Sequence, residues 1–476
     1  MKLFCYTISN GAYAVKFMKT SVPENIFDLY KMLEKEGFEV YIVGGSVRDM
    51  LLKRPVKDWD LTTNARPDEI VKIFPESFYD NEFGTVGIPR AAGGVNSIIE
   101  ITTYRTEKST TPTHKPEEIS WGVSIEEDLA RRDFTINAIA MKLNGSPKDY
   151  KLIDPYGGEK DLQKKTIKAV GDAGLRFKED ALRLLRAIRI ATELEFDIEK
   201  NTWEKIRQDS KLIEHISKER VKTEILRIVK NGNAYRGVML LKDSGLLEYI
   251  IPELTEGVGV SQTRPRRHHT EDVFMHNVLS LKFCPSDNPV VKFATLIHDV
   301  GKPMVAKKDK EGFVIFYNHE VAGAKIAEKI CERLRFSKKE KEKVVTLVRW
   351  HMFSVNENQT DASVRRFIRR IGVENVKDIM DLRIGDRLGG GTQTAESWRL
   401  KLFRKKVEEQ LKPAPFSIND LVLNGNDVME ILKIKPGPRV GQILQALFEQ
   451  VDEDLTKNNK EFLTKRIIEL GKEPAK

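Results

Sequence analysis

The sequence has 476 residues, of which 32% are charged and 40% hydrophobic, so it can bury sizeable cores and is too long for one ordinary domain. A formal net charge of +9 favours a polyanionic partner such as nucleic acid, although 80 basic residues against 71 acidic ones is a modest excess. No run of about 18 apolar residues occurs, which argues against a membrane-spanning helix.

The cysteines and the N-terminal segment indicate a cytoplasmic protein. The cysteines are scattered, odd in number and without metal-ligand spacing, as expected in a reducing compartment: Cys5, Cys284 and Cys331. Polar residues and a glycine interrupt the mildly apolar residues 1–19, and no clear cleavage site follows, so we do not expect a signal peptide.

The first third of the chain alternates between helix and strand patterns. Residues 22–36 have apolar side chains at helical spacing, and Gly37 is well placed to end the helix. Apolar residues at 39–43 and 97–104 and the stretch DWDLTT at 58–63 predict strands. This alternation favours an α+β or α/β head.

After about residue 165 the strand patterns nearly stop and the chain becomes helical. Breaks rich in glycine or proline fall at 252–265, 385–394 and 412–416, and they predict domain boundaries. We therefore expect an α+β fold with four domains: a head at 1–165, a helical neck at 166–250, a third domain at 251–395 and a helical tail at 396–476.

Two glycines and a serine, Gly44, Gly45 and Ser46, lie between an expected strand and an expected helix. Glycines at such a turn let the backbone approach a phosphate without a Cβ in the way, and the amide hydrogens at the helix N-terminus face negative charge. An ordinary strand-to-helix turn would have the same composition, so the turn alone does not assign a phosphate site.

Two carboxylates follow on an expected strand. Asp58 and Asp60 are two residues apart, so on a strand they would share one face, with their Cα atoms about 6.6–7 Å apart. Carboxylates so placed can bridge two Mg²⁺ ions about 3.5–4 Å apart, the arrangement used for phosphoryl transfer. Glu100, on another apolar strand, is a third candidate ligand because an unpaired buried carboxylate would be costly. A solvated strand face is the alternative for the aspartate pair.

The whole stretch GGSVRDMLLKRPVKDWDLTT, residues 44–63, resembles the active-site motif of the class II tRNA nucleotidyltransferases and bacterial poly(A) polymerases. These proteins belong to the DNA polymerase beta-like nucleotidyltransferase superfamily. The resemblance implies a polymerase beta-like head with a mixed sheet, followed by all-helical domains. It also implies that Arg48 joins the glycines and Ser46 in binding the nucleotide, and it extends over roughly residues 22–470.

A second motif, RRDFTINAIAM at 131–141, is similar to the family's ribose- and phosphate-binding motif. By that resemblance Arg132, Asp133 and Asn137 contact the incoming nucleotide, and guanidinium groups suit phosphate oxygens. An ordinary buried strand-to-helix junction is the alternative. A third stretch, at 154–162, resembles the family's hinge-like motif, to which we assign no chemistry.

A fourth motif, EDALRLLRAIRIA at 179–191, resembles the family's base-selecting helix. The resemblance implies that Asp180 and Arg183 form a protein template for CTP or ATP, that Glu179 orients Arg183, and that Arg186 also binds the nucleotide. On the residues alone, an i,i+3 ion pair on a solvated helix would look the same.

The resemblance implies CCA addition to the 3′ end of tRNA from CTP and ATP. Strands expected at 83–107 look like those of CCA-adding enzymes, and the loop at 106–120 has the length expected of enzymes that switch from C to A. Where many relatives have an arginine-rich stretch, this loop has His114 and its neighbours, so a CC-only enzyme stays open, as does a poly(A) polymerase.

Several histidines and aspartates follow in an order typical of HD phosphohydrolases. The metal ligands implied by that resemblance are His276, His298, Asp299 and Asp386, with His319 and His351 for a second ion or a phosphate. Imidazole and carboxylate together suit Mn²⁺, Fe, Ni²⁺ or Zn²⁺. The alternatives are hydrolysis of phosphate esters at RNA ends and a purely RNA-binding scaffold.

Two clusters of basic residues could follow tRNA phosphates, or could simply be solvated helix faces. One lies on an expected helix, at Arg365, Arg366, Arg369 and Arg370; the other comprises Arg399, Lys401, Arg404, Lys405 and Lys406. The oligomeric state cannot be predicted from the sequence.

Overall fold

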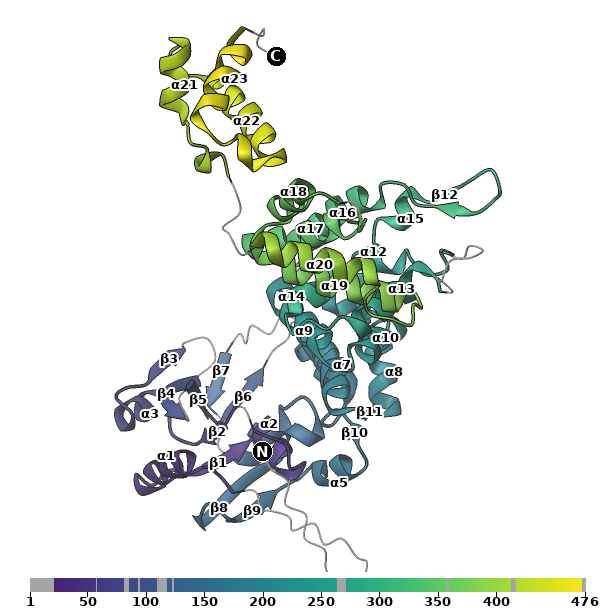
Figure 1. The fold of residues 1–476 in the computed structure, drawn as a ribbon. Coiled ribbons are helices and arrows are strands. Elements are labelled where there is room, and N and C mark those ends of the chain that lie inside the picture. Colours follow the sequence, from purple (N-terminus) through teal and green to yellow (C-terminus); the bar gives the residue numbers. More distant parts are fainter. Residues whose placement is uncertain are drawn as a thin grey trace, which may run out of the picture. The chain divides into compact units, whose positions relative to one another are not determined.

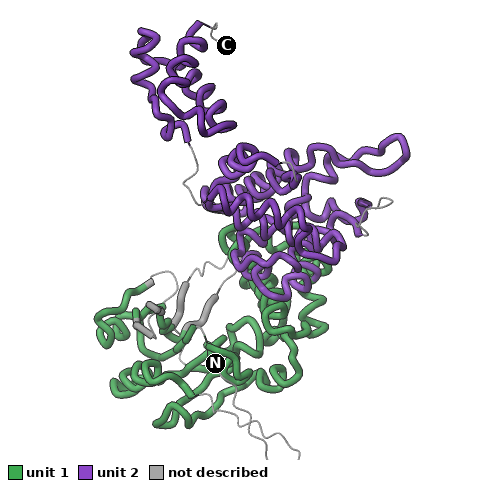
Figure 2. The backbone as a smooth tube through the Cα atoms, viewed as in Figure 1, with its two compact units in different colours: residues 1–224, 240–250 green, residues 225–239, 251–476 purple. Residues whose placement is uncertain are grey.

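The computed structural model describes residues 21–56, 58–80, 85–92, 95–108, 118–121, 124–262, 271–356, 359–411 and 417–472. Two compact units make up the chain (Figure 2): residues 1–224 with 240–250, and residues 225–239 with 251–476. The four domains expected from the sequence stay a prediction. Among the described helices, none is both long and apolar enough to cross a bilayer.

A seven-stranded mixed sheet forms the centre of the first unit, in the order β3-β4-β5-β2-β1-β8-β9 (Figure 1). Its strands are β1 (Val40–Val43), β2 (Asp60–Thr63), β3 (Phe78–Asp80), β4 (Thr85–Ala92), β5 (Val95–Thr103), β8 (Ala140–Ser146) and β9 (Asp149–Ile153). Strand β2 runs parallel to β5 and antiparallel to β1. This mixed sheet confirms the expected α+β head.

Short helices flank the sheet: α1 (Glu24–Lys35), α2 (Gly45–Leu51), α3 (Pro67–Ile73), α4 (Ile125–Ala130), η1 (Thr135–Asn137) and α5 (Gly158–Gln163). Helix α1 confirms the expected first helix, and it buries the four apolar side chains at helical spacing: Ile26, Leu29, Tyr30 and Leu33. The Tyr30 hydroxyl accepts a hydrogen bond from the Leu143 amide of β8 at 3.1 Å. Small two-stranded sheets pair β6 (Arg105–Lys108) with β7 (Glu118–Trp121), and β10 (Thr166–Ile167) with β11 (Asp197–Ile198).

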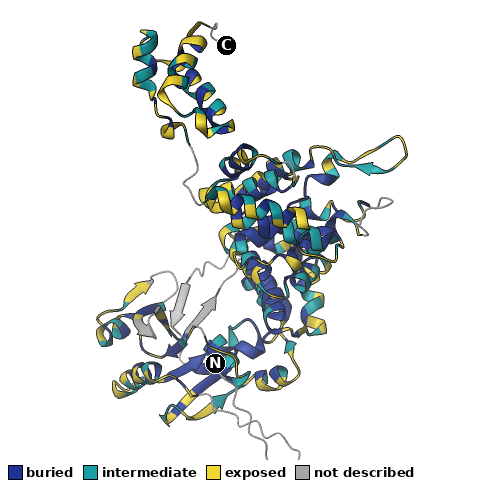
Figure 3. Ribbon diagram, viewed as in Figure 1, coloured by how far each residue is buried: buried dark blue, intermediate teal, exposed yellow. Residues whose placement is uncertain are grey.

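Helices follow the head: α6 (Ala173–Glu179), α7 (Leu182–Leu194), α8 (Lys200–Asp209), η2 (Ser210–His215), α9 (Lys218–Lys230), α10 (Ala234–Asp243) and α11 (Leu246–Ile250). Helix α7 is buried around most of its circumference (Figure 3). Its Arg189 is also buried, and its guanidinium pairs with Glu224 of α9 at 2.6 Å and with Glu193 at 2.8 Å. Burial of Arg189 is possible because both partners neutralise it.

Over the residues of the second unit that the structure describes, regular structure is helical apart from a small hairpin of β12 (Lys307–Lys308) and β13 (Val314–Ile315). Besides residues 225–239, which include parts of α9 and α10, it contains α12 (Pro252–Thr255), α13 (Val273–Phe283), α14 (Pro289–Leu296), α15 (Lys302–Val305), α16 (His319–Arg333), α17 (Lys338–Trp350), α18 (Asp361–Ile371), η3 (Val373–Asn375) and α19 (Val376–Gly389). Helices α13 and α19 pack closely, since a Cβ added to Gly385 would lie 2.6 Å from the Ser280 carbonyl oxygen. This close packing carries Asp386 of α19 towards His276 of α13.

The last helices are α20 (Trp398–Leu411), η4 (Ile418–Asp420), α21 (Gly425–Leu432), α22 (Pro438–Glu453), η5 (Leu455–Lys457) and α23 (Lys460–Lys472). Helices α21 to α23 share a core of their own, centred on Val428, Leu447, Val451, Leu463 and Ile467. Asp452 of α22 is buried between Arg365 and Arg369 of α18, at 2.8 and 2.5 Å. Those two arginines are therefore structural, which removes half of the first basic cluster from the expected RNA surface.

Candidate functional site

The glycine turn takes the conformation that the phosphate hypothesis requires. Strand β1 ends at Val43, helix α2 begins at Gly45, and Gly44 between them has φ 73°, a left-handed conformation that favours glycine. The Ser46 hydroxyl donates to the Val43 carbonyl oxygen at 2.6 Å, which ties the helix start to the end of the strand. A Cβ on Gly44 would lie 3.0 Å from Arg132 Nη1 and 3.3 Å from Asp60 Oδ2, so these two groups both approach the turn.

Three carboxylates gather beside this turn. Asp60 is the first residue of β2, and its register partner on the parallel strand β5 is Glu100. Burial raises the pKa of Asp60 to about 6; Arg132 opposes this shift, and Glu100 and Asp58 add to it. Negative groups therefore crowd Asp60, and the site favours a cation. The donors are all oxygens, which fits Mg²⁺, and Asp58, Asp60 and Glu100 would be its ligands.

One detail of this prediction was wrong. Asp58 does not lie on a strand; it is an exposed residue in a bend two positions before β2. Pairing begins only at Asp60 because its partner on β1 is Val43, the last residue before the glycine turn. Asp58 nevertheless remains near enough to raise the pKa of Asp60.

The expected nucleotide-binding residues of the second motif form a hydrogen-bonded chain. Arg48 Nη1 donates to Asn137 Oδ1 at 3.0 Å, and Asn137 Nδ2 donates to Asp133 Oδ1 at 3.0 Å. The other Asp133 oxygen accepts from Arg186 Nε at 2.7 Å. Burial alone would raise the pKa of Asp133, but Arg186 outweighs it and holds that pKa well below its usual range. The chain thus links α2 to α7 through fixed charges.

The pair expected to select the base, Asp180 and Arg183, is also held in place, although not as two neighbours on one helix face. Asp180 is an extended residue between α6 and α7, and its two oxygens accept from the Leu182 amide at 3.0 Å and from Arg220 Nη2 at 2.9 Å. The expectation that it lies on the helix was wrong, because its carboxylate caps the start of α7. Arg220 comes from α9, and the i,i+3 pattern did not point to it.

Arg183 is buried and its guanidinium is oriented from three directions. Nη1 donates to Glu179 Oε2 at 2.7 Å and to the Arg176 carbonyl oxygen at 3.1 Å, and Nη2 donates to the Arg131 carbonyl oxygen at 2.7 Å. The contact with Glu179 is the one expected from the sequence. A guanidinium fixed in this way can present a constant donor pattern to a base edge.

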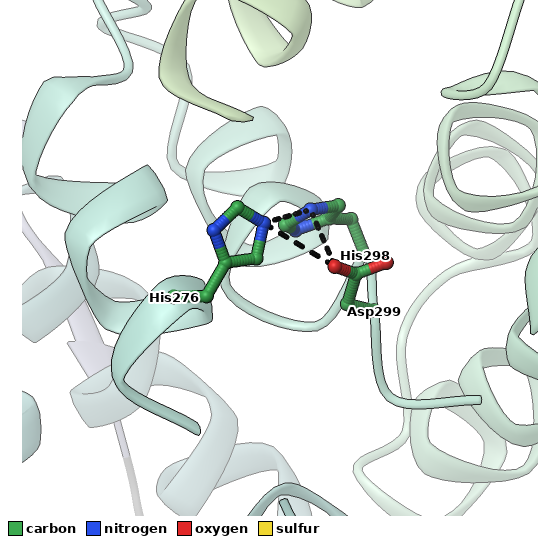
Figure 4. A group of neighbouring side chains, drawn as sticks. All are labelled: His276, His298 and Asp299. Carbon is green, nitrogen blue, oxygen red and sulfur yellow. Dashed lines mark hydrogen bonds and ion pairs between the residues drawn. The ribbon is translucent and has the colours of Figure 1, made fainter. Parts of the chain in front are cut away.

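A second constellation lies in the second unit, where histidines and aspartates are buried together. His276 of α13 and His298, which follows α14, bring their Nε2 atoms to 3.2 Å, and Asp299 Oδ2 lies 3.2 and 3.4 Å from them (Figure 4). Asp386 Oδ1 lies 3.3 Å from His276 Nε2. All four residues that the sequence nominated therefore meet at one point.

The other oxygen of Asp299 faces a second pair of imidazoles. Asp299 Oδ1 lies 3.2 Å from His319 Nε2 and 3.5 Å from His351 Nε2. Both triads, His276 with His298 and Asp299, and Asp299 with His319 and His351, have donor atoms close enough together to hold one ion each. Asp299 would bridge the two positions.

The tautomers of these histidines fit a metal site. Nδ1 lies 2.8 Å from the Thr295 carbonyl oxygen in His298, 2.8 Å from that of Phe316 in His319, and 2.7 Å from that of Val348 in His351. A carbonyl can only accept, so each Nδ1 carries a hydrogen, and in the neutral imidazole Nε2 is the atom that would offer its lone pair to a metal.

A buried lysine beside this cluster escaped the sequence reasoning. Lys302 Nζ lies 2.5 Å from Asp299 Oδ2 and 2.5 Å from Gln262 Oε1. Its position three residues after Asp299 was the available signal, because residues at i and i+3 can meet at a helix start. The loop with His114, by contrast, falls largely outside the described residues.

Comparisons with known proteins cover both units. The family description "Poly A polymerase head domain" matches residues 40–168, "Probable RNA and SrmB- binding site of polymerase A" matches 195–257, and a tRNA nucleotidyltransferase domain 2 matches 309–467. The chain is 35% identical over 339 residues to an A-adding tRNA nucleotidyltransferase of Deinococcus radiodurans. This alignment covers 68% of this chain and 75% of that protein.

CCA-adding enzymes are also similar, over a shorter stretch. The chain is 39% identical over 229 residues to the enzyme of Geobacillus thermodenitrificans, which covers 48% of this chain and 54% of that protein. The chain is 43% identical over 211 residues to the enzyme of Listeria innocua, and this alignment covers 44% of this chain and 51% of that protein. The match thus spans about half the length of these two relatives.

Solved structures extend the likeness to nearly the whole chain. The crystal structure of the Bacillus stearothermophilus CCA-adding enzyme in complex with CTP has a TM-score of 0.69 at 25% identity, and covers 94% of this chain and 96% of that one. Together with the Deinococcus relative, these matches carry the same conclusion as the carboxylate and arginine geometry of the head: the chain belongs to the tRNA nucleotidyltransferase family.

Proposed function

We propose that this protein transfers nucleotides from CTP and ATP to the 3′ end of tRNA and completes a terminal CCA. The observation that carries the proposal is the group of carboxylates next to the glycine turn, with Arg132 Nη1 and Asp60 Oδ2 both beside Gly44. Such a site brings a cation, a triphosphate and an attacking hydroxyl to one place.

Each part of the head has a distinct role in this proposal. Asp58, Asp60 and Glu100 would hold Mg²⁺, which supplies a lowered pKa at the attacking hydroxyl and charge neutralisation at the leaving pyrophosphate. Arg132 would bind the triphosphate, and the chain from Arg48 through Asn137 and Asp133 would keep the sugar side of the site rigid. Asp180 and Arg183 would read the base.

A single experiment separates this activity from its neighbours. Purified protein is incubated with Mg²⁺ and tRNA transcripts that end at the discriminator base, at C or at CC, with CTP, ATP or both, and the 3′ ends are sequenced. We expect CCA to be completed on every transcript and addition to halt there. A long A tail on any RNA would instead indicate a poly(A) polymerase.

Two narrower activities are further outcomes of the same experiment. Addition of A only to transcripts ending in CC would make the protein an A-adding enzyme, like the similar Deinococcus protein. A stall after CC would make the protein a CC-adding enzyme and would point to the loop around His114. Unchanged 3′ ends on all transcripts would contradict the proposal.

For the second unit we propose a metal-dependent phosphohydrolase that acts on phosphate groups at RNA ends. The supporting observation is the buried histidine cluster, with Asp299 shared between two groups of ligand atoms. Candidate ions are Mn²⁺, Fe, Ni²⁺ and Zn²⁺.

The hydrolase proposal is tested with the full chain. Metal content is measured by mass spectrometry, and hydrolysis of 2′,3′-cyclic phosphate ends and of p-nitrophenyl phosphate is assayed with each ion. We expect bound metal and hydrolysis in the wild type, and loss of both in His298→Ala. The exposed His215→Ala variant, far along the chain from the cluster, serves as the matched control. A wild type that binds metal without hydrolysing either substrate would leave the cluster a structural centre and overturn the activity.

A further inference from the structure

Asp128 of α4 is a carboxylate buried completely inside the head, with 0% of its surface exposed. Oδ1 accepts from Arg131 Nε at 3.0 Å and Nη2 at 2.6 Å. Oδ2 accepts from Arg132 Nε at 3.3 Å and Nη2 at 2.9 Å. One buried acid thus orients two successive guanidinium groups, each through two nitrogens, and neither the motif nor its expected roles drew attention to it.

The contact with Asp128 uses two of the three guanidinium nitrogens of Arg132, and the third faces the candidate site. Asp128 engages Nε and Nη2 of Arg132, and the remaining nitrogen, Nη1, is the one that lies beside Gly44 and Asp60. An arginine side chain has several rotatable bonds, so a fixed anchor on one edge of the guanidinium determines where the other edge points. The position of Nη1 therefore depends on Asp128.

The same short segment also supports the base-selecting arginine. The Arg131 carbonyl oxygen accepts from Arg183 Nη2 at 2.7 Å, and the preceding carbonyl, of Ala130, accepts from Arg176 at 3.1 Å. Asp128, through the side chains of residues 131 and 132, holds the end of α4 between the triphosphate side and the base side of the site.

We infer that Asp128 is a positioning residue that sets the guanidinium of Arg132 against the incoming triphosphate. The inference rests on the proposed nucleotidyl transfer and assigns a residue to it. In this role Asp128 affects triphosphate binding through Arg132, and does not only contribute to folding. Burial would raise the pKa of Asp128, but Arg132 and Arg131 outweigh it and lower that pKa, in keeping with a carboxylate that stays charged between two cations.

The first test substitutes Asp128→Asn, which keeps the shape and removes the charge. We expect the KM for CTP and for ATP to rise and kcat/KM to fall about 100-fold, because a misplacement of about 1 Å can have that effect. The KM for tRNA should stay within about twofold. Glu126→Gln, on the same helix but exposed, makes the same chemical change and should leave all these constants unaltered.

A double-mutant cycle with Arg132→Ala separates positioning from stability. If Asp128 acts through Arg132, Asp128→Asn should lower kcat/KM by less than about threefold when Arg132 is already alanine. Independent losses that multiply in the double variant would overturn the inference, as would a wild-type KM for both triphosphates in Asp128→Asn.

Asp128→Glu keeps the variant series informative if the asparagine protein does not fold. It retains the charge that both arginines need and lengthens the side chain by one methylene, so we expect a folded protein by circular dichroism with a KM for CTP raised about tenfold. A folded Asp128→Glu protein with unaltered KM would contradict the positioning role. An inactive wild type would instead refute the proposed function itself, so the two failures are distinguishable.

Discussion

At the residue scale, acidic and basic side chains of the head lie close together around the turn at Gly44. Burial raises the pKa of Asp60; Arg132 opposes this shift, and the carboxylates of Glu100 and Asp58 add to it. Asp133 is the opposite case, since Arg186 keeps its pKa low despite burial. The first environment favours a cation, whereas in the second the carboxylate already has a guanidinium partner.

The carboxylate assignment predicts a separation of catalysis from RNA binding. Asp60→Ala should lower the rate of nucleotide addition by about 1,000-fold, because a metal ligand contributes several kcal/mol to the transition state. The Kd for tRNA, measured by filter binding without triphosphate, should change less than about threefold. Asp68→Ala, an exposed aspartate on α3, is the matched control. Turnover near the wild-type rate in Asp60→Ala would exclude the metal role.

The template assignment predicts a loss of choice rather than a loss of binding. Arg183 is fixed by Glu179 and two backbone carbonyls, so Arg183→Ala should remove a constant donor pattern from the base site. We expect the preference for CTP and ATP over UTP and GTP to fall about tenfold or more, with a smaller change in triphosphate affinity. Competition assays with all four nucleotides measure this, with exposed Arg207→Ala as control. Unchanged selectivity would refute the template role.

The sequence pointed to most residues of the candidate site but to few of the groups that hold them. Gly44, Asp60 and Arg183 were recognisable because their motifs are local. Asp128, Arg220 and Lys302 were missed because their roles depend on which atoms they contact, and Arg220 reaches Asp180 from 40 residues away.

At the scale of elements, charged side chains decide how helices of the second unit meet. Helix α22 contacts α18 through Asp452, which is only 2% exposed and lies between two arginines. Arg369 also lies over the Phe448 ring at 4.8 Å. The sequence showed a row of arginines that suited RNA equally well, and only the register of the two helices assigns half of them to packing.

The contact of Asp452 with Arg365 and Arg369 should make a pH-dependent contribution to the free energy of unfolding. Burial opposes ionisation of Asp452, but hydrogen bonds from Arg369 and Arg365 prevail and lower its pKa. A depressed folded pKa means that the contribution is present above the unfolded value of about 4 and is lost as pH falls through the folded value. Asp452→Asn should therefore destabilise this region by about 3 kcal/mol at pH 7.

Calorimetric melting of the full chain between pH 7.5 and pH 3 measures the effect. The melting temperature of Asp452→Asn should lie below that of the wild type by a constant amount down to about pH 5, and the gap should close below about pH 4. Glu449→Gln, an exposed acid on the same helix, should show no gap. A gap that widens as the pH falls would contradict the assignment.

Element boundaries were predictable where the pattern was regular and failed where a site interrupts it. The first helix and the strands near 40 and 100 match α1, β1 and β5 closely, because burial dictates their patterns: apolar side chains at helical spacing in α1 and a continuous apolar run in the fully buried β1. Asp58 was expected on a strand but precedes β2, and Asp180 was expected on a helix but precedes α7. Both are carboxylates at the start of an element, where the pattern continues but the backbone pairing does not.

At the scale of the whole molecule, two sites suited to phosphate chemistry lie in different compact units. The carboxylates of the head belong to the first unit, and the histidine cluster belongs to the second. Their donor sets differ, oxygen alone in one and imidazole with carboxylate in the other, so they should prefer different ions.

Separate donor sets predict separable activities. Asp299→Ala should abolish metal retention at the histidine cluster, because this residue is shared between both groups of ligand atoms. Nucleotide addition by the same variant should stay within about twofold of the wild type. Parallel assays of metal content and 3′-end extension on one preparation check this; Asp287→Ala, an exposed aspartate of the same unit, is the control. Joint loss of both activities would show that the sites are coupled.

The CCA-adding activity is tested by the 3′-end sequence of one substrate, a tRNA transcript that ends at the discriminator base, after incubation with the full chain, Mg²⁺, CTP and ATP. We expect the transcripts to gain C, C and A in that order and not to be extended further. Transcripts whose 3′ ends remain unchanged would contradict it.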